Sequence, residues 1–275
     1  RIAAETQNFN QRRTQCHGYS GYDFNRCLYG GPQISAILVG DSHASAVATA
    51  VQQVLPSPDH GLLTFTYTSC PTIFGVQKRD RPDLKCAEFN DWVMQEIAEL
   101  PAEIPIIIVN STSDNVFGSN RPDQANYGQA SAYFSEPIDY PTEAFKTEFA
   151  ERLTESACRI AETRPVFLVR PIPEMPVDVP KVAARKQLIG QPIAINTSLQ
   201  DYHARHALVW QAQIAHIGLV EFQYPEVRQC RKQLQGTGPV EFLAIRKVET
   251  FQVGVIPKIG WQTFNTGARK AQMAE

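Results

Sequence analysis

The sequence predicts an α/β protein, a three-layer α/β/α sandwich in which helices cover both faces of a mostly parallel sheet. Short apolar runs of strand length alternate along the chain with windows of helical periodicity, and this alternation is typical of parallel sheets. With 275 residues, the chain is long enough to bury a large core. Catalytic groups of such folds lie on loops at the carboxyl ends of the strands, so we expect the functional site there.

The first strand and the first helix form the clearest pair. Residues 34–39 are an apolar run that breaks at Gly40 and leads into an alanine-rich helical pattern over residues 44–54. Further apolar runs predict strands at 62–67, 104–109, 166–169 and 219–222. The helical patterns that alternate with these strands cover residues 87–100, 144–161 and 199–217.

Three stretches show no sustained periodicity. Residues 1–33 are polar and predict a loop-like extension, held by a pair of cysteines, in front of a main domain of residues 34–275. Residues 111–141 and 171–192 are longer than ordinary connections, and such segments are usually functional or disordered. We expect them to face a substrate, because the first one interleaves aromatic and amide side chains, namely Asn115, Phe117, Asn120, Tyr127 and Tyr133.

The composition excludes several classes of protein. Lys and Arg number 26 against 28 Asp and Glu, so the chain lacks the basic surface that nucleic-acid binding requires. The apolar run at 104–109 is far shorter than the roughly 20 residues that cross a bilayer. No metal-ligand spacing is evident, and we expect neither a metal nor a cofactor. The chain starts at Arg1 without Met or a signal peptide, which indicates a piece of a longer protein.

The chain has six cysteines, of which the first four form two pairs separated by short loops. Neither spacing is a Cys-x-x-Cys zinc or redox pattern. An even number with loop-closing spacing is typical of an oxidising compartment, so we predict the disulfides Cys16–Cys27 and Cys70–Cys86. The alternative is a set of buried free thiols in a cytosolic protein.

Ser42 is the candidate nucleophile. It lies in the string Gly-Asp-Ser-His at residues 40–43, between the first predicted strand and the first predicted helix. A serine at a helix N-terminus lies where free backbone N–H groups and the helix dipole stabilise developing negative charge. The alternative is that Asp41 or Ser42 is an ordinary helix N-cap, a role that both residue types fill well.

The Gly-Asp-Ser-His string resembles the first sequence block of the SGNH (GDSL-like) hydrolase superfamily. Further stretches are similar to the periplasmic SGNH domains that are fused to membrane acyltransferases, and together they cover roughly residues 10 to 217 in the right order. They lie at residues 69–75, 86–90, 166–175, 177–180 and 202–207.

This resemblance implies a function and a site. Members of the family O-acylate cell-surface glycans such as O-antigen, lipooligosaccharide or peptidoglycan, and a membrane acyltransferase domain supplies the acyl group. It also implies a periplasmic domain that is tethered to the inner membrane in the full-length protein. Ser42 matches the nucleophile, and Gly75 and Asn110 match the residues that complete the oxyanion hole. Both could instead be turn residues, Asn110 at the end of a strand.

The chain departs from the family near its C-terminus. Superfamily members carry an Asp-x-x-His there, which supplies the catalytic base, but no Asp or His follows His216 and residues 218–275 are atypical. His206 is the substitute candidate, with His203 on the same predicted helix face, although such neighbours are mostly structural. Two alternatives to the acyltransferase therefore stay open. They are a carbohydrate esterase, and a catalytically silent domain that binds a glycan or docks a partner.

Overall fold

The structure is a computed structural model and describes residues 10–215 and 240–241. In the main sheet of these residues, the strands lie in the order β1-β4-β3-β6-β8-β9, and β2 also pairs with β4. Every pairing in this sheet is parallel except that of β2 with β4, so the predicted mostly parallel sheet is confirmed. The strands are β1 (His17–Gly18), β2 (Arg26–Gly30), β3 (Gln33–Gly40), β4 (His60–Tyr67), β6 (Ile106–Val109), β8 (Val166–Leu168) and β9 (Val240–Glu241).

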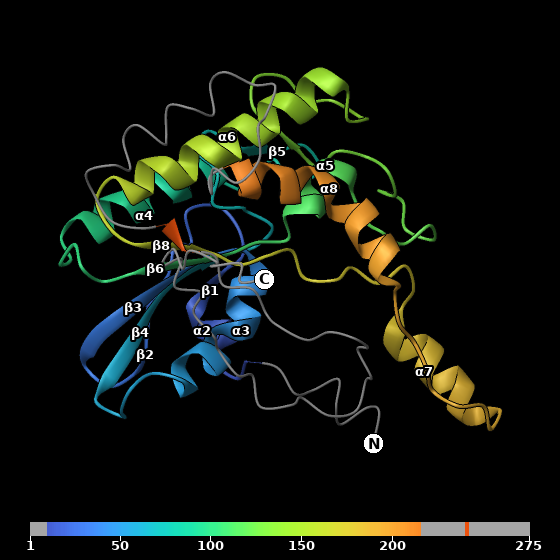
Figure 1. Ribbon diagram of the computed structural model, residues 1–275, viewed down its shortest axis with the longest axis horizontal. Helices are drawn as coiled ribbons and strands as arrows, with labels where there is room; N and C mark the ends of the chain where they lie inside the picture. Colours follow the sequence, from blue (N-terminus) through green and yellow to red (C-terminus); the bar gives the residue numbers. More distant parts are fainter. Residues whose placement is uncertain (1–9, 216–239, 242–275) are drawn as a thin grey trace, which may run out of the picture.

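Helices cover the sheet on both faces, as Figure 1 shows for α4 and α6 on one side and α3 on the other. A second, two-stranded sheet pairs β5 (Gln77–Lys78) with β7 (Ala132–Tyr133). The helices are α2 (Arg13–Cys16), α3 (Ser42–Gln53), α4 (Cys86–Ala98), α5 (Thr112–Phe117), α6 (Glu143–Ala161), α7 (Val179–Leu188) and α8 (Leu199–Ala215). None of the described helices combines the length and the apolar character that spanning a bilayer requires.

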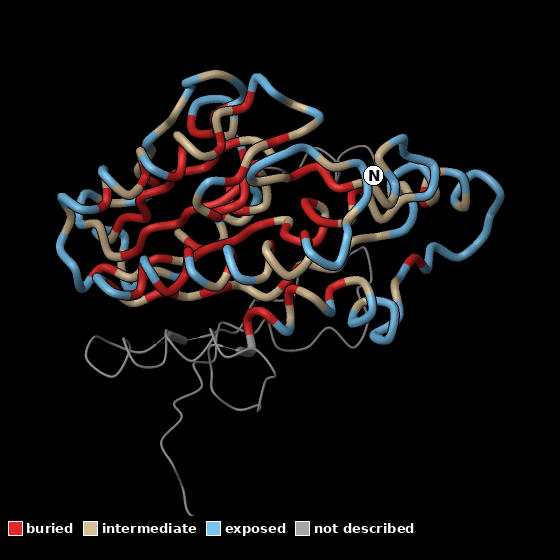
Figure 2. Tube along the Cα trace, turned by 90° about the horizontal axis from the view of Figure 1, so that it is seen from above, coloured by how far each residue is buried: buried red, intermediate tan, exposed pale blue. Residues whose placement is uncertain are grey.

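The core consists of two apolar clusters, one on each face of the sheet. Successive side chains of a strand point to opposite faces, and β3 follows this rule. Its Ile37 and Val39 join the cluster that contains residues of α4 and α6, whereas Ala36 and Leu38 join the cluster that contains residues of α3. Figure 2 shows the buried segments running through the middle of the molecule. Burial on both faces explains why this strand is a continuous apolar run in the sequence.

The prediction was wrong about parts of the irregular stretches. Residues 13–30 contribute α2, β1 and β2, and both strands pair with β4, so this segment is built into the sheet. Short edge strands and a four-residue helix leave no periodic pattern to read. The long stretches likewise contain α5 and β7 in the first, and α7 in the second. The strand predicted at 219–222 lies outside the described residues.

Both predicted disulfides are present and therefore confirmed. The Cα atoms of Cys16 and Cys27 are 5.4 Å apart, and this bond joins α2 to β2. The Cα atoms of Cys70 and Cys86 are 5.2 Å apart, and this bond joins the loop after β4 to the start of α4. Both distances lie within the usual range for a disulfide.

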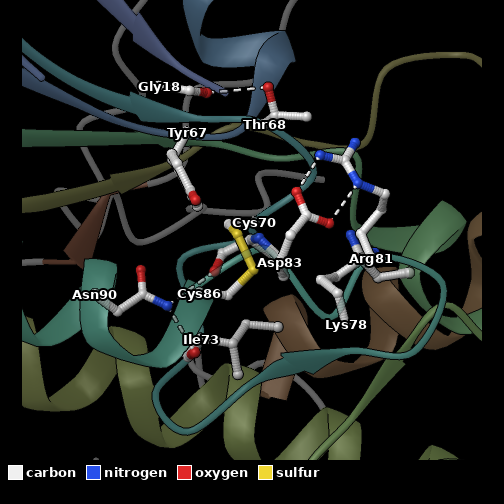
Figure 3. The surroundings of a disulfide bond; sticks show 12 residues. Gly18, Tyr67, Thr68, Cys70, Ile73, Lys78, Arg81, Asp83, Cys86 and Asn90 are labelled. Carbon is white, nitrogen blue, oxygen red and sulfur yellow. Dashed lines mark hydrogen bonds and ion pairs between the residues drawn. A yellow bond between two sulfur atoms is a disulfide. The ribbon is translucent and has the colours of Figure 1, made fainter. Parts of the chain in front are cut away.

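The side chain of Asn90 forms hydrogen bonds close to the Cys70–Cys86 disulfide, as Figure 3 shows. The Nδ2 group of Asn90, on α4, donates to the backbone oxygens of Pro71 at 3.1 Å and of Ile73 at 2.8 Å. The loop after β4 is therefore fixed to α4 by one covalent bond and two hydrogen bonds. This matters because the same loop contacts the candidate site described below.

We expect removal of the Cys70–Cys86 bond to destabilise the protein by about 3 kcal/mol, because a loop of this length becomes unconstrained in the unfolded chain. The test is urea unfolding of the Cys70→Ala/Cys86→Ala double variant, which leaves no unpaired thiol from this bond. Wild-type protein without reductant is the reference. Equal unfolding midpoints and slopes for the two proteins contradict this expectation.

Candidate active site

Strand β3 delivers Ser42 to the carboxyl end of the sheet. The strand ends at Gly40, which pairs with Val109 of β6 and has a φ of +150°. A Cβ atom at this position would lie only 2.0 Å from the Val109 backbone oxygen, so only glycine fits. The chain then turns directly into α3, whose first residue is Ser42. Its position at the first turn, where backbone N–H groups lack helical partners, is the one expected from the sequence.

Asp41 is the N-cap of α3. Its buried carboxylate accepts a hydrogen bond from the backbone N–H of His43 at 2.8 Å through Oδ1. The other oxygen, Oδ2, accepts from the backbone N–H of Ser111 at 2.6 Å. Asp41 thus joins the start of α3 to the loop that follows β6. Because Asp41 fills the cap, the Ser42 hydroxyl is not needed there, and it makes no hydrogen bond to any described residue.

Asn110 directly follows β6 and lies against the end of β3. Its Oδ1 atom is 2.8 Å from the place that a Cβ atom of Gly40 would occupy. The same oxygen accepts hydrogen bonds from the backbone N–H of Thr72 at 3.2 Å and from its hydroxyl at 3.3 Å. A backbone N–H can only donate, so this bond fixes which end of the carboxamide is the oxygen. The Nδ2 group makes no hydrogen bond within the described residues and remains available as a donor.

The loop after β4 contacts Asn110 through Thr72, whereas the oxyanion role of Gly75 stays a prediction. Gly75 is exposed, has a φ of +76°, and a Cβ atom there would have no neighbour within 4 Å. Its positive φ favours glycine by backbone conformation alone, as in a turn. Sequence reasoning missed Thr72, although it lies within the stretch 69–75 that carries the family resemblance.

Several charged side chains act on His43, the residue that follows Ser42. The Nδ1 atom of His43 is 3.3 Å from Oδ1 of Asp41. Burial lowers the pKa of the His43 imidazole, but the Asp41 carboxylate and the negative charges of Glu174 and Asp114 outweigh burial, so this pKa lies above its ordinary value. Glu174 is itself paired with Arg205, whose Nε donates to it at 2.7 Å. Residues of α3, α5, α8 and the stretch 171–192 therefore share one electrostatic environment.

The buried amine of Lys78 is hydrogen-bonded to α5. Its Nζ donates to Oδ1 of Asn115 at 2.8 Å and to the hydroxyl of Ser131 at 2.7 Å, and burial lowers its pKa. Asn115 also donates to the backbone oxygen of Ser111 at 2.9 Å. The expectation that Asn115 faces a substrate is therefore wrong, because its carboxamide is buried and occupied by the fold. Sequence reasoning did not single out Lys78.

His206, the predicted substitute base, lies on α8 and contacts a different serine. Its Nδ1 atom is 2.7 Å from the hydroxyl of Ser113 on α5. Its Nε2 atom is buried without a hydrogen-bond partner, and burial, with smaller contributions from Arg205 and His203, lowers its pKa to about 4. His206 is thus a neutral ring that links α8 to α5, whereas His203 is exposed on the same helix.

The lowered pKa of His206 predicts an acid-sensitive fold. The unfolded chain binds a proton near pH 6.5 and the folded chain only near pH 4, so stability is lost as the pH falls through this window. The His206→Asn variant keeps a partner for Ser113 but does not titrate. Between pH 6.5 and pH 4, we expect its free energy of unfolding to fall by about 3 kcal/mol less than that of wild type. Urea unfolding at both ends of the window measures this difference, and parallel losses in the two proteins contradict it.

Residues of the two long irregular stretches and of α8 line an open pocket of about 540 Å³. Three of the five side chains expected to face a substrate line it, whereas Tyr133 belongs to β7. Arg205, which is bonded to Glu174, forms part of the wall. The pocket is lined by Phe117, Asn120, Tyr127, Gly128, Pro176, Asn196, Thr197, Asp201, Ala204 and Arg205.

Residues 13–237 match the family described as "SGNH domain (fused to AT3 domains)". Curated protein sequences give no match. A solved structure similar to this chain is the periplasmic domain of a lipopolysaccharide acetyltransferase from Salmonella ser. Paratyphi A, with 15% sequence identity and a TM-score of 0.43. The similarity covers 67% of this chain and 64% of that chain, which is slightly less than two thirds of the latter.

Proposed function

The chain belongs to the family of SGNH domains that are fused to AT3 domains, and on this basis we propose that it transfers an acyl group to a hydroxyl of a cell-surface glycan. The AT3 membrane acyltransferase domain is the proposed acyl donor. The proposed location is the periplasm, with the domain tethered to the inner membrane in the full-length protein. One observation supports the chemistry above all. Ser42 follows β3 and Asn110 follows the neighbouring strand β6, and neither the Ser42 hydroxyl nor the Asn110 Nδ2 group makes a hydrogen bond within the described residues.

In the proposed reaction, Oγ of Ser42 attacks the carbonyl carbon of the acyl donor and gives its proton to a base. The tetrahedral oxyanion is stabilised by Nδ2 of Asn110 and by free backbone N–H groups at the start of α3. The leaving group then departs with a proton, which leaves an acyl ester on Ser42. In the second step, a glycan hydroxyl attacks this ester and restores the serine.

The structure does not support His206 as the base of this reaction. Its Nδ1 atom is engaged by Ser113, and its buried Nε2 atom makes no hydrogen bond to Ser42. We therefore assign His206 the role of fixing α5 against α8, and we expect slow turnover of small acetyl esters by this chain alone. Because α5 begins just after Asn110, its fixed position also positions the oxyanion donor.

The acceptor glycan has a suitable place beside the site. Helix α5 has six residues and is thus about 9 Å long, with Asn110 before its start and Phe117 at its end, in the pocket wall. The pocket is lined by the aromatic residues Phe117 and Tyr127 together with Asn196 and Asn120, whose Nδ2 group also donates to the backbone oxygen of Glu174 at 2.6 Å. Apolar ring faces combined with amide hydrogen-bonding groups suit the apolar and hydroxyl surfaces of a sugar.

Labelling with a fluorophosphonate probe tests whether Ser42 is an activated nucleophile. Because His206 does not serve as a base for Ser42, we expect slow labelling of the peptide that contains Ser42 in the folded protein, and none after heat denaturation, since any activation depends on the folded site. Absence of labelling contradicts the proposal and favours the silent glycan-binding or docking domain. The esterase is distinguished by the product, because an esterase releases free acid at the same rate whether or not a glycan is added.

A further inference from the structure

Five of the six large aliphatic side chains that are exposed in the described residues lie between residues 177 and 199. They belong to α7, to the segments that flank it and, in the case of Leu199, to the start of α8. Figure 1 shows α7 projecting away from the sheet and its covering helices. The exposed fractions reach 86% for Leu188, 67% for Leu199 and 59% for Ile189. Single exposed aliphatic residues are normal on soluble proteins, but such a concentration on one projection marks an interaction surface.

The tip of this projection is a formed turn. After α7, Gly190 adopts a φ of +67°, its N–H donates to the backbone oxygen of Gln187 at 3.2 Å, and Gln191 donates to that of Lys186 at 2.9 Å. This pair of bonds is the usual glycine-terminated end of a helix. The Nζ group of Lys186 also donates to the backbone oxygen of Ala194 at 3.2 Å, which ties the returning chain to the helix. The fold therefore holds Leu188 and Ile189 in solvent.

The charges on this projection are basic. Lys181, Arg185 and Lys186 lie on α7, whereas Asp178 is the single carboxylate between residues 177 and 199. Asp178 caps the root of α7, where it accepts from the backbone N–H of Lys181 at 3.0 Å, and it lies 3.4 Å from Arg121. The exposed tip thus combines aliphatic side chains with an excess of positive charge, in a chain whose net charge is −2.

We propose that the tip of α7 and the following turn, with Leu188, Ile189 and Ile193, insert into the surface of an anionic lipid bilayer. Aliphatic side chains next to Lys and Arg are the combination that binds the interface of such a membrane. A stable protein interface needs about 20 to 30 residues on each side, which is more than this tip offers. The inference is independent of acyl transfer, because no group beside Ser42 takes part.

Flotation with lipid vesicles tests the proposal directly. We expect the protein to float with vesicles of phosphatidylglycerol and to remain in solution with vesicles of phosphatidylcholine. The Leu188→Ser/Ile189→Ser variant should bind phosphatidylglycerol at least about tenfold more weakly, because the inserted apolar area is lost. The Lys181→Gln/Arg185→Gln variant should lose about fivefold for each charge, and added salt should weaken wild-type binding in the same way.

The matched control is Val54→Ser, which removes the one large aliphatic side chain that is exposed outside this projection in the described part of the chain, and it should bind as wild type does. Circular dichroism melting curves establish that each variant is folded. The proposal is wrong if wild type does not bind phosphatidylglycerol or if Leu188→Ser/Ile189→Ser binds as tightly as wild type. It is also wrong if, without lipid, that variant abolishes a concentration-dependent dimer, because a second copy of the chain then covers the tip.

Discussion

Replacing Ser42 with alanine should reduce acyl transfer to the background rate, a loss of at least about 10³-fold, because no ester can form on the missing hydroxyl. The fold should not change, since Asp41 and not Ser42 caps α3. Release of para-nitrophenol from para-nitrophenyl acetate measures the first step, and acetylation of an added glycan measures the second.

The control for this variant is Thr49→Ala, which alters an exposed hydroxyl on the same helix and should retain wild-type rates. Thermal unfolding of both variants should match wild type within about 0.5 kcal/mol, as is usual for substitutions that remove no buried contact. Undiminished acetylation of the glycan by Ser42→Ala contradicts the proposed covalent mechanism. The glycan hydroxyl would then attack the acyl donor directly, without an ester on Ser42.

The second large effect is expected from Asn110→Asp, which should lower the acyl-transfer rate by about 10² to 10³-fold. Aspartate keeps an oxygen that can accept from Thr72, but it replaces the Nδ2 donor with a negative charge next to the developing oxyanion. The loss should appear in the maximal rate and not in the concentration of substrate needed for half of it, because the donor acts in the transition state.

Thr72→Val separates this effect from a general disturbance of the loop. Valine removes the hydroxyl that donates to Asn110 at 3.3 Å but keeps the backbone N–H that donates at 3.2 Å, so the carboxamide should stay in place. We expect a rate loss of less than about tenfold for Thr72→Val. If Asn110→Asp is folded and as active as wild type, the assignment of Asn110 to the oxyanion hole is wrong.

The main part of the fold could be predicted because its strands are buried on both faces. Strands β3 and β4 are buried over most of their length, and the carboxyl end of β3 leads into α3 through a glycine that no other residue can replace. By contrast, β1 and β2 are held by pairing with β4 and by a disulfide, and α7 buries only Ala183. Elements that lack an apolar stripe of their own leave no periodic signal.

The candidate site could be predicted only where its residues follow strands. Ser42 and Asn110 come after β3 and β6, which are neighbours in the sheet, so topology alone brings them together. Thr72 and Lys78 could not be found in this way. Their partners, Asn110 and Asn115, lie 38 and 37 residues away in the segment that follows β6, and such contacts depend on the folded paths of both segments. The sequence indicates His206 as a candidate base because histidine is a common catalytic base, but only the structure shows that its partner is Ser113.

The most direct test of the account is to detect the acyl group on Ser42 during turnover. Isotope-labelled para-nitrophenyl acetate is mixed with the protein, the reaction is quenched in acid, and the peptides are analysed by mass spectrometry. We predict one labelled acetyl group on the peptide that contains Ser42, and transfer of that label to a glycan hydroxyl when the acceptor is added. Labelled glycan that forms without any acetyl-Ser42, or that forms equally well in Ser42→Ala, contradicts the account.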